Sequence, residues 1–309
     1  MAMNGSVVSY PDRGPWGDNR YRGNCSGRLI ADVIEQYVPK DGIFVDVTLG
    51  GGTSRDVVRD LFPGVKFLGL DLNPQANPEV GSFDFTKDSV REAVERTFGR
   101  AADVCFSHPP YGPMIQYSGN MWGAPHASDT SRCSDEEFLE KSRFMLLNQR
   151  DAVDPGGLYM TLIGDRRQKG QYVSYQADFI SMMPRNELKG IIIKTQHNCV
   201  SDSRNYARMR HPRVLHEYLI VWERSAQTFV AMSMEKAYEM KRRINGTWAT
   251  VVRFALMKLG GQATLDVIYR EVEEVAGDKA ARNPTWQATV RRTLQQHFQN
   301  VQRGVWAIA

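Results

Sequence analysis

Glycines and acidic residues stand where the sequence predicts strand ends, a placement typical of nucleoside binding. The predicted strand in "GIFVDVTLGGG" carries Asp46 into Gly50–Gly52, and glycines let the backbone approach a ligand closely. "FLGLDLNP" ends a second predicted strand with Asp71, where an acid commonly accepts both hydroxyls of a ribose. "GSFDF" sets Asp84 and Phe85 at an expected third strand end, able to hold an adenine by its amino group and its face. The spacing is not Gly-x-Gly-x-x-Gly, which argues against a dinucleotide.

A stiff turn follows the next predicted strand. "ADVCF" reads as a buried strand, and Ser107 leads from it into His108-Pro109-Pro110-Tyr111. Two adjacent prolines fix the backbone and remove two N–H groups, so the turn is rigid and presents Tyr111 at its tip.

This turn resembles the signature of the S-adenosylmethionine-dependent DNA methyltransferases that modify exocyclic amino groups: Asp, Asn or Ser, then Pro-Pro, then Tyr, Phe or Trp. The resemblance implies that the target base leaves the duplex and enters a pocket, where Tyr111 stacks on it. The carbonyl of Pro109 and the side chain at position 108 would accept hydrogen bonds from the exocyclic amine. Pro110 completes the rigid turn. This geometry directs the nitrogen lone pair at the methyl group of the cofactor.

The sequence departs from the family pattern at position 108, where it has histidine. A neutral imidazole has one acceptor nitrogen and can still receive one N–H bond, whereas a protonated one cannot. We therefore expect activity to fall as the pH drops through the pKa of His108, which is about 6.5 for an unperturbed histidine.

The likeness to this family extends over roughly residues 10–224. "RGNCSGRLI", before the first strand, resembles the segment that closes over the methionine part of the cofactor. Because it precedes "DVTLGGG" and "HPPY", the order matches the class whose recognition region is C-terminal. The implied cofactor residues are Asn24, Ser26, Asp46, Thr48, Gly50, Gly51, Gly52, Asp71, Asp84 and Phe85.

Alternating strands and helices are predicted around these residues. Apolar spacing indicates helices at 27–38, 53–62, 88–99 and 134–153, the last opening with Ser134 and Glu137 in a capping-box pattern. The alternation predicts an α/β, doubly wound, mainly parallel sheet of the Rossmann-like methyltransferase kind, with an antiparallel strand late in the chain.

After Arg224 the pattern changes to three helices and a closing β-ribbon, the layout of a small winged-helix domain. The expected division is an arm at 1–27, a methyltransferase domain at 28–224, a linker at 225–245 and a DNA-binding domain at 246–309. Predicted DNA contacts lie in the third helix and in the polar loop "QHNCVSDSRNYARMRH"; they are Thr285, Gln287, Arg291, Arg292, Arg204 and Arg208.

Charge supports a polyanionic partner for this tail. The chain carries +4 overall, but Lys241 to Ala309 has eleven basic and five acidic residues, a net of +6. Four scattered cysteines without a Cys-x-x-Cys pair suit a reducing cytosol, so a cytoplasmic protein is expected. The six histidines show no metal-ligand spacing, no apolar run reaches the roughly 18 residues of a membrane span, and no signal peptide is recognised.

The sequence therefore predicts a methyltransferase that uses S-adenosylmethionine to modify the adenine N6 of double-stranded DNA, without a metal. Cytosine N4 is the alternative target. A non-catalytic DNA-binding regulator and an RNA or protein-glutamine methyltransferase are further alternatives. The small recognition region suggests low stringency, as in some prophage enzymes, and a partner restriction nuclease is conceivable in a restriction-modification system.

Overall fold

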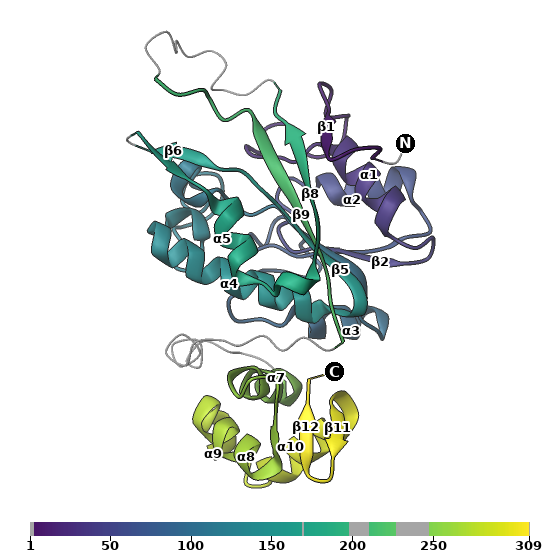
Figure 1. The fold of residues 1–309 in the computed structure, drawn as a ribbon, viewed down its shortest axis with the longest axis vertical. Helices are drawn as coiled ribbons and strands as arrows, with labels where there is room; N and C mark the ends of the chain where they lie inside the picture. Colours follow the sequence, from purple (N-terminus) through teal and green to yellow (C-terminus); the bar gives the residue numbers. More distant parts are fainter. Residues whose placement is uncertain (1–2, 169, 198–209, 227–246, 309) are drawn as a thin grey trace.

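The computed structural model describes residues 3–168, 170–197, 210–226 and 247–308, which form two bodies (Figure 1). The larger body is built on a seven-stranded sheet of order β1-β8-β9-β5-β4-β2-β3. Its strands are β1 (Val7–Ser9), β2 (Ile43–Asp46), β3 (Lys66–Gly69), β4 (Ala102–Ser107), β5 (Val153–Ile163), β8 (Leu188–Thr195) and β9 (His216–Glu223).

Strand directions agree with the prediction of a mainly parallel sheet. β3, β2, β4 and β5 pair in parallel, and β9 runs antiparallel between β5 and β8. This is the Rossmann-like methyltransferase fold. Because β2, β3 and β4 are parallel, their carboxyl ends meet at one edge of the sheet, where ligands bind in such folds.

Helices cover both faces of this sheet. Phe44, Val104 and Phe106 pack on one face against the apolar residues of α1 and α2. Ile43 and Val45 flank Phe44 in β2, so their side chains point to the opposite face of the sheet. There they pack against the apolar residues of α3, α4 and α5. The helices are α1 (Gly27–Tyr37), α2 (Thr53–Leu61), α3 (Val90–Phe98), α4 (Asp135–Ala152) and α5 (Tyr175–Met182), with 3-10 turns at Gly112–Met114, Thr130–Arg132 and Arg185–Glu187.

Helix ends follow the local sequence. The predicted capping box at α4 is confirmed: the Ser134 hydroxyl accepts from the backbone of Glu137, whose carboxylate accepts from the backbone N–H of Ser134. α3 begins after Ser89, whose hydroxyl accepts from the backbone N–H of Glu92. It ends before Gly99, which has a left-handed conformation.

Two expectations about strands were wrong. "GSFDF" forms no strand: residues 81–84 have no regular secondary structure, and a turn begins at Phe85. The backbone N–H of Phe83 donates to the carbonyl of Asp71 just after β3, but no strand ladder follows from this bond. Part of the N-terminal arm, expected as loop, forms β1 and pairs with β8. The sequence also gave no sign that "GDRRQKGQYV" contains the hairpin of β6 (Arg166–Gln168) and β7 (Gln171–Val173).

The smaller body contains the three predicted helices and the closing ribbon around their own core. Its sheet has the order β10-β12-β11, so a short strand before the second helix joins the ribbon. The elements are α7 (Trp248–Lys258), β10 (Gln262–Thr264), α8 (Leu265–Val275), α9 (Gly277–Ala281), α10 (Trp286–His297), β11 (Gln299–Gln302) and β12 (Val305–Ala307). The predicted linker at 225–245 lies outside the described residues except for its first two positions.

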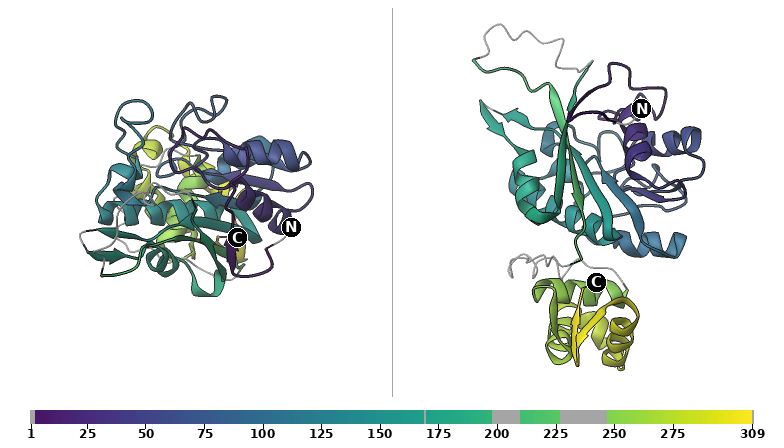
Figure 2. Two further views of the ribbon diagram at one scale, coloured as in Figure 1. Left: turned by 90° about the horizontal axis from the view of Figure 1, so that it is seen from above. Right: turned by 45° about the vertical axis from the view of Figure 1, so that its right-hand side comes forward.

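Helix α7 lies on the side of the smaller body that faces the larger body (Figures 1 and 2). The Glu92 carboxylate on α3 accepts bonds from the backbone N–H of Thr247 and from the hydroxyl of Thr250 at the start of α7. Arg253 forms an ion pair of 2.9 Å with Asp151, and both side chains are largely buried. The small body is therefore attached at the end of α4 that precedes β5.

Candidate active site

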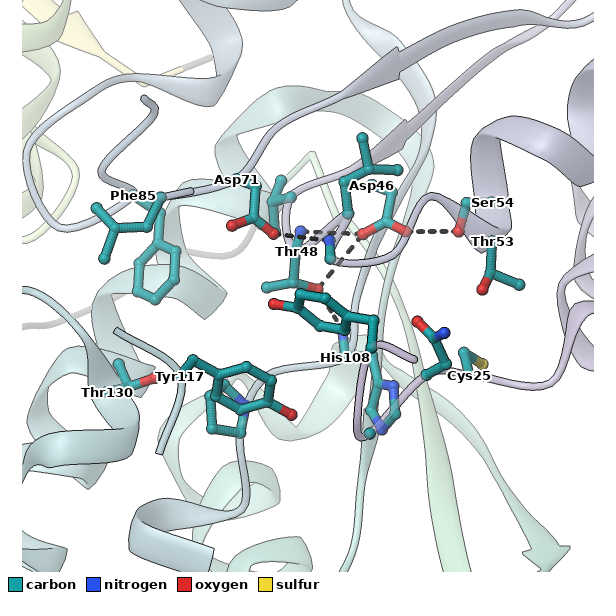
Figure 3. Close-up of a pocket in the computed structure, with 18 of the residues that line it drawn as sticks. Cys25, Asp46, Thr48, Thr53, Ser54, Asp71, Phe85, His108, Tyr117 and Thr130 are labelled. Carbon is teal, nitrogen blue, oxygen red and sulfur yellow. Dashed lines mark hydrogen bonds between the residues drawn. The ribbon is translucent and has the colours of Figure 1, made fainter. Parts of the chain in front are cut away.

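A hollow of about 750 Å³ opens at the carboxyl ends of β2, β3 and β4 (Figure 3). The loops after these strands form its base, the N-terminal arm forms one side, and the loop after the proline turn forms the other. Its lining includes Tyr21, Asn24, Cys25, Asp46, Thr48, Gly50, Asp71, Phe85, His108, Pro110, Tyr117 and Asp129.

Asp46 anchors the loop after β2. Its carboxylate accepts bonds from the Ser54 hydroxyl and from the backbone N–H of Thr48, at 2.9 Å for the latter. Burial raises its pKa to about 6, although these hydrogen bonds oppose the shift. A carboxylate that is ionised above pH 6 thus faces the hollow and attracts a cationic ligand.

Asp71 crosses from the end of β3 to the glycine turn. Its two oxygens accept from the backbone N–H groups of Gly50, at 2.7 Å, and Asn73, at 2.8 Å. Each carboxylate oxygen has a second acceptor site, so both can still bind ribose hydroxyls. Burial raises the pKa of Asp71 to about 6 against the effect of these bonds.

The glycine turn leaves room for a ligand only because it lacks side chains. Gly50 has a φ of +52°, and a Cβ there would lie 2.9 Å from the ring of Tyr21. Gly50 lines the hollow, whereas Gly51 packs against Asn24 and Gly52 precedes α2, so these two shape the turn from behind. These residues fit a nucleoside-type cofactor such as S-adenosylmethionine.

Besides Gly51 and Gly52, two further predicted cofactor residues, Asp84 and Ser26, are not part of the lining. The Asp84 oxygens accept from the Thr86 hydroxyl and the Lys87 ammonium, and these partners keep its pKa below its usual value although burial opposes them. Asp84 therefore organises its own loop, while the neighbouring Phe85 lines the hollow. Ser26 is buried at the start of α1 and is not part of the lining, in contrast to Asn24.

The proline turn leaves β4 as predicted. Ser107 points into the core, where its hydroxyl bonds Gln149 and Thr161. The backbone N–H of His108 donates to the Thr48 hydroxyl at 2.6 Å, which ties the turn to the loop after β2. His108 and Pro110 line the hollow and Pro109 is buried, so position 108 and the predicted cofactor residues Asp46, Gly50 and Asp71 line the same hollow.

Tyr111 is oriented differently from the exposed tip that the sequence suggested. Its ring lies against Gly164 at the end of β5, and its hydroxyl donates to the Glu217 carboxylate at 2.7 Å. The same oxygen lies 2.8 Å from Nε2 of His108. These contacts hold Tyr111 partly buried beside the hollow rather than in its lining.

His108 stays neutral to a lower pH than the sequence suggested. Burial lowers its pKa to about 4; the Glu217 carboxylate opposes this shift and the Lys194 ammonium supports it. The expectation of a pKa near 6.5 held only for a solvated imidazole. Neutral histidine is the form that can accept a bond from an amine.

Several lining residues were missed because they lie outside the recognised motifs. Tyr21 of the arm and Tyr117 of the loop after the turn stack with ring centroids 5.6 Å apart across one side of the hollow. Asp129 fixes that loop by accepting from the backbone and hydroxyl of Ser118 and of Ser131. The cluster of Ser and Asp residues in "SDTSR" was the available signal.

The predicted DNA contacts in the tail are exposed. Thr285 and Gln287 lie at the start of α10, and Arg291 and Arg292 lie one turn further on, while Val290 and Leu294 are buried. Arg204 and Arg208 lie outside the described residues.

No family model and no curated protein matches the chain. Among solved structures it is similar to TrmN from Thermus thermophilus (14% identity, TM-score 0.41, 66% of this chain and 50% of that one). It is also similar to an rRNA methylase from Streptococcus thermophilus (13%, 0.34, 64% and 96%) and an O-methyltransferase family protein from Burkholderia thailandensis (12%, 0.36, 65% and 55%). The chain thus spans about half of TrmN, and none of these likenesses identifies a substrate.

The described residues contain no group of three or more His, Cys, Asp or Glu side chains that could hold a metal ion. None of their helices combines the length and the apolar character needed to cross a bilayer.

Proposed function

We propose that this protein transfers the methyl group of S-adenosylmethionine to the exocyclic amine of a DNA base, adenine N6 in the first instance and cytosine N4 as the alternative. The observation that carries the proposal is that Asp46, Asp71 and Gly50 line the same hollow as His108 and Pro110. The first three suit a cationic nucleoside cofactor, and the last two lie where an amine acceptor is needed.

The residues have separate roles in this proposal. Asp71 binds the ribose, Asp46 and the turn at Gly50 hold the methionine end, and Phe85 contacts the adenine face. When bound, the cofactor would supply an electrophilic methyl group; its transfer to the amine nitrogen would leave a neutral thioether and release one amine proton. The protein contributes orientation and exclusion of water, because it aligns the amine lone pair with the methyl group.

We also propose that residues 246–309 are a winged-helix domain that binds double-stranded DNA. Its order of helices and strands and its exposed arginines support this assignment. Phosphate contacts from Arg291 and Arg292 would add affinity without specifying a sequence.

Methyl transfer from radiolabelled cofactor to DNA, RNA and protein, assayed in parallel, tests the proposal. We expect label in duplex DNA, recovered as N6-methyladenine after digestion to nucleosides. Label only in RNA or only in protein would contradict the DNA assignment. Cofactor binding without transfer to any of the three would favour the non-catalytic regulator.

A further inference from the structure

Position 108 is the place where this chain departs from the residues expected in an amine acceptor, and the structure shows what surrounds the substituted histidine. Three side chains form a continuous hydrogen-bonded row: His108 Nε2 lies 2.8 Å from the Tyr111 hydroxyl, which lies 2.7 Å from Oε1 of Glu217. His108 and Tyr111 come from the turn after β4, and Glu217 comes from β9.

The direction of the hydrogen bonds in this row follows from the ionisation state of Glu217, the last residue of the row. Burial opposes ionisation of Glu217, but the charge of Lys194 and further hydrogen bonds outweigh it and lower the pKa of Glu217 to about 2. Lys194 lies 2.7 Å from Oε2 of Glu217, and Gln196 donates to Oε1 at 2.8 Å. An ionised carboxylate only accepts, so the single proton of the Tyr111 hydroxyl points to Glu217.

The tautomer of His108 is then determined. Since the Tyr111 oxygen has used its proton, it can only accept from the imidazole, and Nε2 must carry hydrogen. A neutral imidazole with hydrogen on Nε2 has a lone pair on Nδ1. Within the described part of the chain, Nδ1 receives no hydrogen bond, and His108 lines the hollow.

We infer that Glu217 and Tyr111 are positioning residues that fix His108 with its proton on Nε2, so that Nδ1 is the acceptor for an N–H of the target amine. Nδ1 thereby replaces the carboxylate or amide oxygen expected at this position. The inference rests on the proposed function, because the amine is the substrate of that reaction.

Charged groups around the row favour the same state. Burial lowers the pKa of His108 to about 4, so the imidazole is neutral at pH 7. Burial together with the Glu217 carboxylate raises the pKa of Tyr111 well above its usual value, which keeps the hydroxyl protonated. Cys25 and Tyr117 are the other titratable neighbours, and burial raises the pKa of both to about 12.

Nitrogen NMR of the wild-type protein at pH 7, with ¹⁵N in the histidine rings, tests the tautomer without any assay of activity. The His108 signals are those lost in His108→Asn. We expect a protonated Nε2 and an unprotonated Nδ1. A proton on Nδ1, or on both nitrogens, would overturn the inference.

Kinetics of Tyr111→Phe test the consequence, because phenylalanine keeps the aromatic ring and breaks the row. We expect kcat to fall about tenfold, with cofactor affinity unchanged and with loss of the single His108 tautomer. Tyr172→Phe is the matched control, since it removes another hydroxyl bonded to a carboxylate, that of Asp165, outside the row. An unchanged kcat in Tyr111→Phe, with the wild-type enzyme active on DNA, would contradict the inference alone. Absence of DNA methylation by the wild-type enzyme, with the expected His108 tautomer present, would instead reject the proposed function.

Discussion

Two carboxylates, the buried Asp46 and the partly buried Asp71, define the electrostatics of the hollow at the scale of single residues. Both have a pKa raised to about 6 by burial, and both keep free acceptor capacity after their bonds to the protein. Ionisation of these carboxylates in the absence of a ligand costs free energy, because they are withdrawn from water. A cationic cofactor with hydroxyl donors relieves that cost, so binding should be coupled to their ionisation.

The affinity for S-adenosylmethionine should therefore depend on pH. A carboxylate with a raised pKa takes up a proton as the pH falls through about 6, and its protonated form accepts fewer bonds from the ribose. We expect affinity to be constant above pH 7 and to weaken by up to about tenfold per unit below pH 6 for each group that must ionise. Titration calorimetry between about pH 5 and 8 would measure it.

Asp71→Asn separates the two carboxylates. It should weaken binding at pH 8 by about 1.5–3 kcal/mol, the usual contribution of a charge-assisted bond, and should reduce the slope below pH 6. Asp41→Asn, at an exposed acid outside the hollow, is the matched control. If Asp71→Asn binds like the wild type at pH 8, Asp71 does not hold the ribose.

The fall of the methylation rate at low pH, its acid limb, should report the protonation of His108. Because burial lowers its pKa to about 4, the acceptor form persists in acid and is lost only as the pH falls through that value. We expect kcat, measured with saturating cofactor and DNA, to hold down to about pH 5. A wild-type limb centred near pH 6.5 would show that the imidazole is solvated in the complex.

Sequence reasoning reached individual residues unevenly. Asp71 and His108 stand beside strand ends and could be recognised from their neighbours. Glu217 is 106 positions from Tyr111, and its role depends on a contact between β9 and the turn after β4 that no local pattern reports. The tautomer of His108 could be derived only after that contact was known.

At the scale of secondary structure, periodic apolar residues predicted the helices and the long strands well. α1, α3 and α4 occur where apolar spacing and caps placed them. β1 has only three residues, and backbone bonds to β8 define it, so no periodicity could signal it. The loop at 81–85 has strand-like residues, but a bond between the backbone groups of Phe83 and Asp71 turns the chain away.

The junction after β5 illustrates how an element positions a functional side chain. Gly164 follows the last residue of β5, and a Cβ added there would lie 2.5 Å from the ring of Tyr111. The Gly164→Ala variant should push the ring aside and break its bond to Glu217. We expect kcat to fall about tenfold or more, and stability to fall by about 1–3 kcal/mol from overpacking.

Gly190→Ala provides the matched control for this variant. Gly190 lies in β8, and an added Cβ would have no atom within 4 Å. It should leave kcat unchanged. Equal effects of the two substitutions would indicate a general loss of strand stability rather than displacement of Tyr111.

At the scale of the whole molecule, the two bodies meet far from the proline turn. Arg253 of the small body pairs with Asp151 just before β5, whereas Gly164 contacts Tyr111 just after it. Val153 pairs with Ala102 at the start of β4, and Thr161 pairs with Ser107 at its end. At about 3.3 Å per residue, the five steps of β4 from Ala102 to Ser107 put roughly 17 Å of sheet between this attachment and the turn. Figure 1 shows the small body beyond that end of β5.

This separation constrains how one duplex can meet both bodies. A length of roughly 17 Å corresponds to about five base pairs at about 3.4 Å each, and α10 lies beyond the point of attachment. If a base enters the hollow while α10 contacts phosphates, the duplex must extend more than about five base pairs past that base. Arg291 and Arg292 would then contribute to affinity only on DNA with a long flank.

Charge reversal of the two arginines on duplexes of two lengths tests this arrangement. In Arg291→Glu/Arg292→Glu, we expect affinity for a duplex with flanks of about 20 base pairs to fall at least tenfold, and the slope of log affinity against log salt to decrease by about two. For a duplex with flanks of about five base pairs, wild type and variant should bind alike, because this short duplex does not reach α10. Cofactor affinity should be unchanged in both proteins. The Gln295→Glu/Gln296→Glu variant, at exposed positions one turn further along α10, measures the effect of added negative charge without loss of arginine. An equal loss on short and long duplexes would mean that α10 lies beside the target base when DNA is bound. No loss on either length would mean that α10 binds something other than DNA.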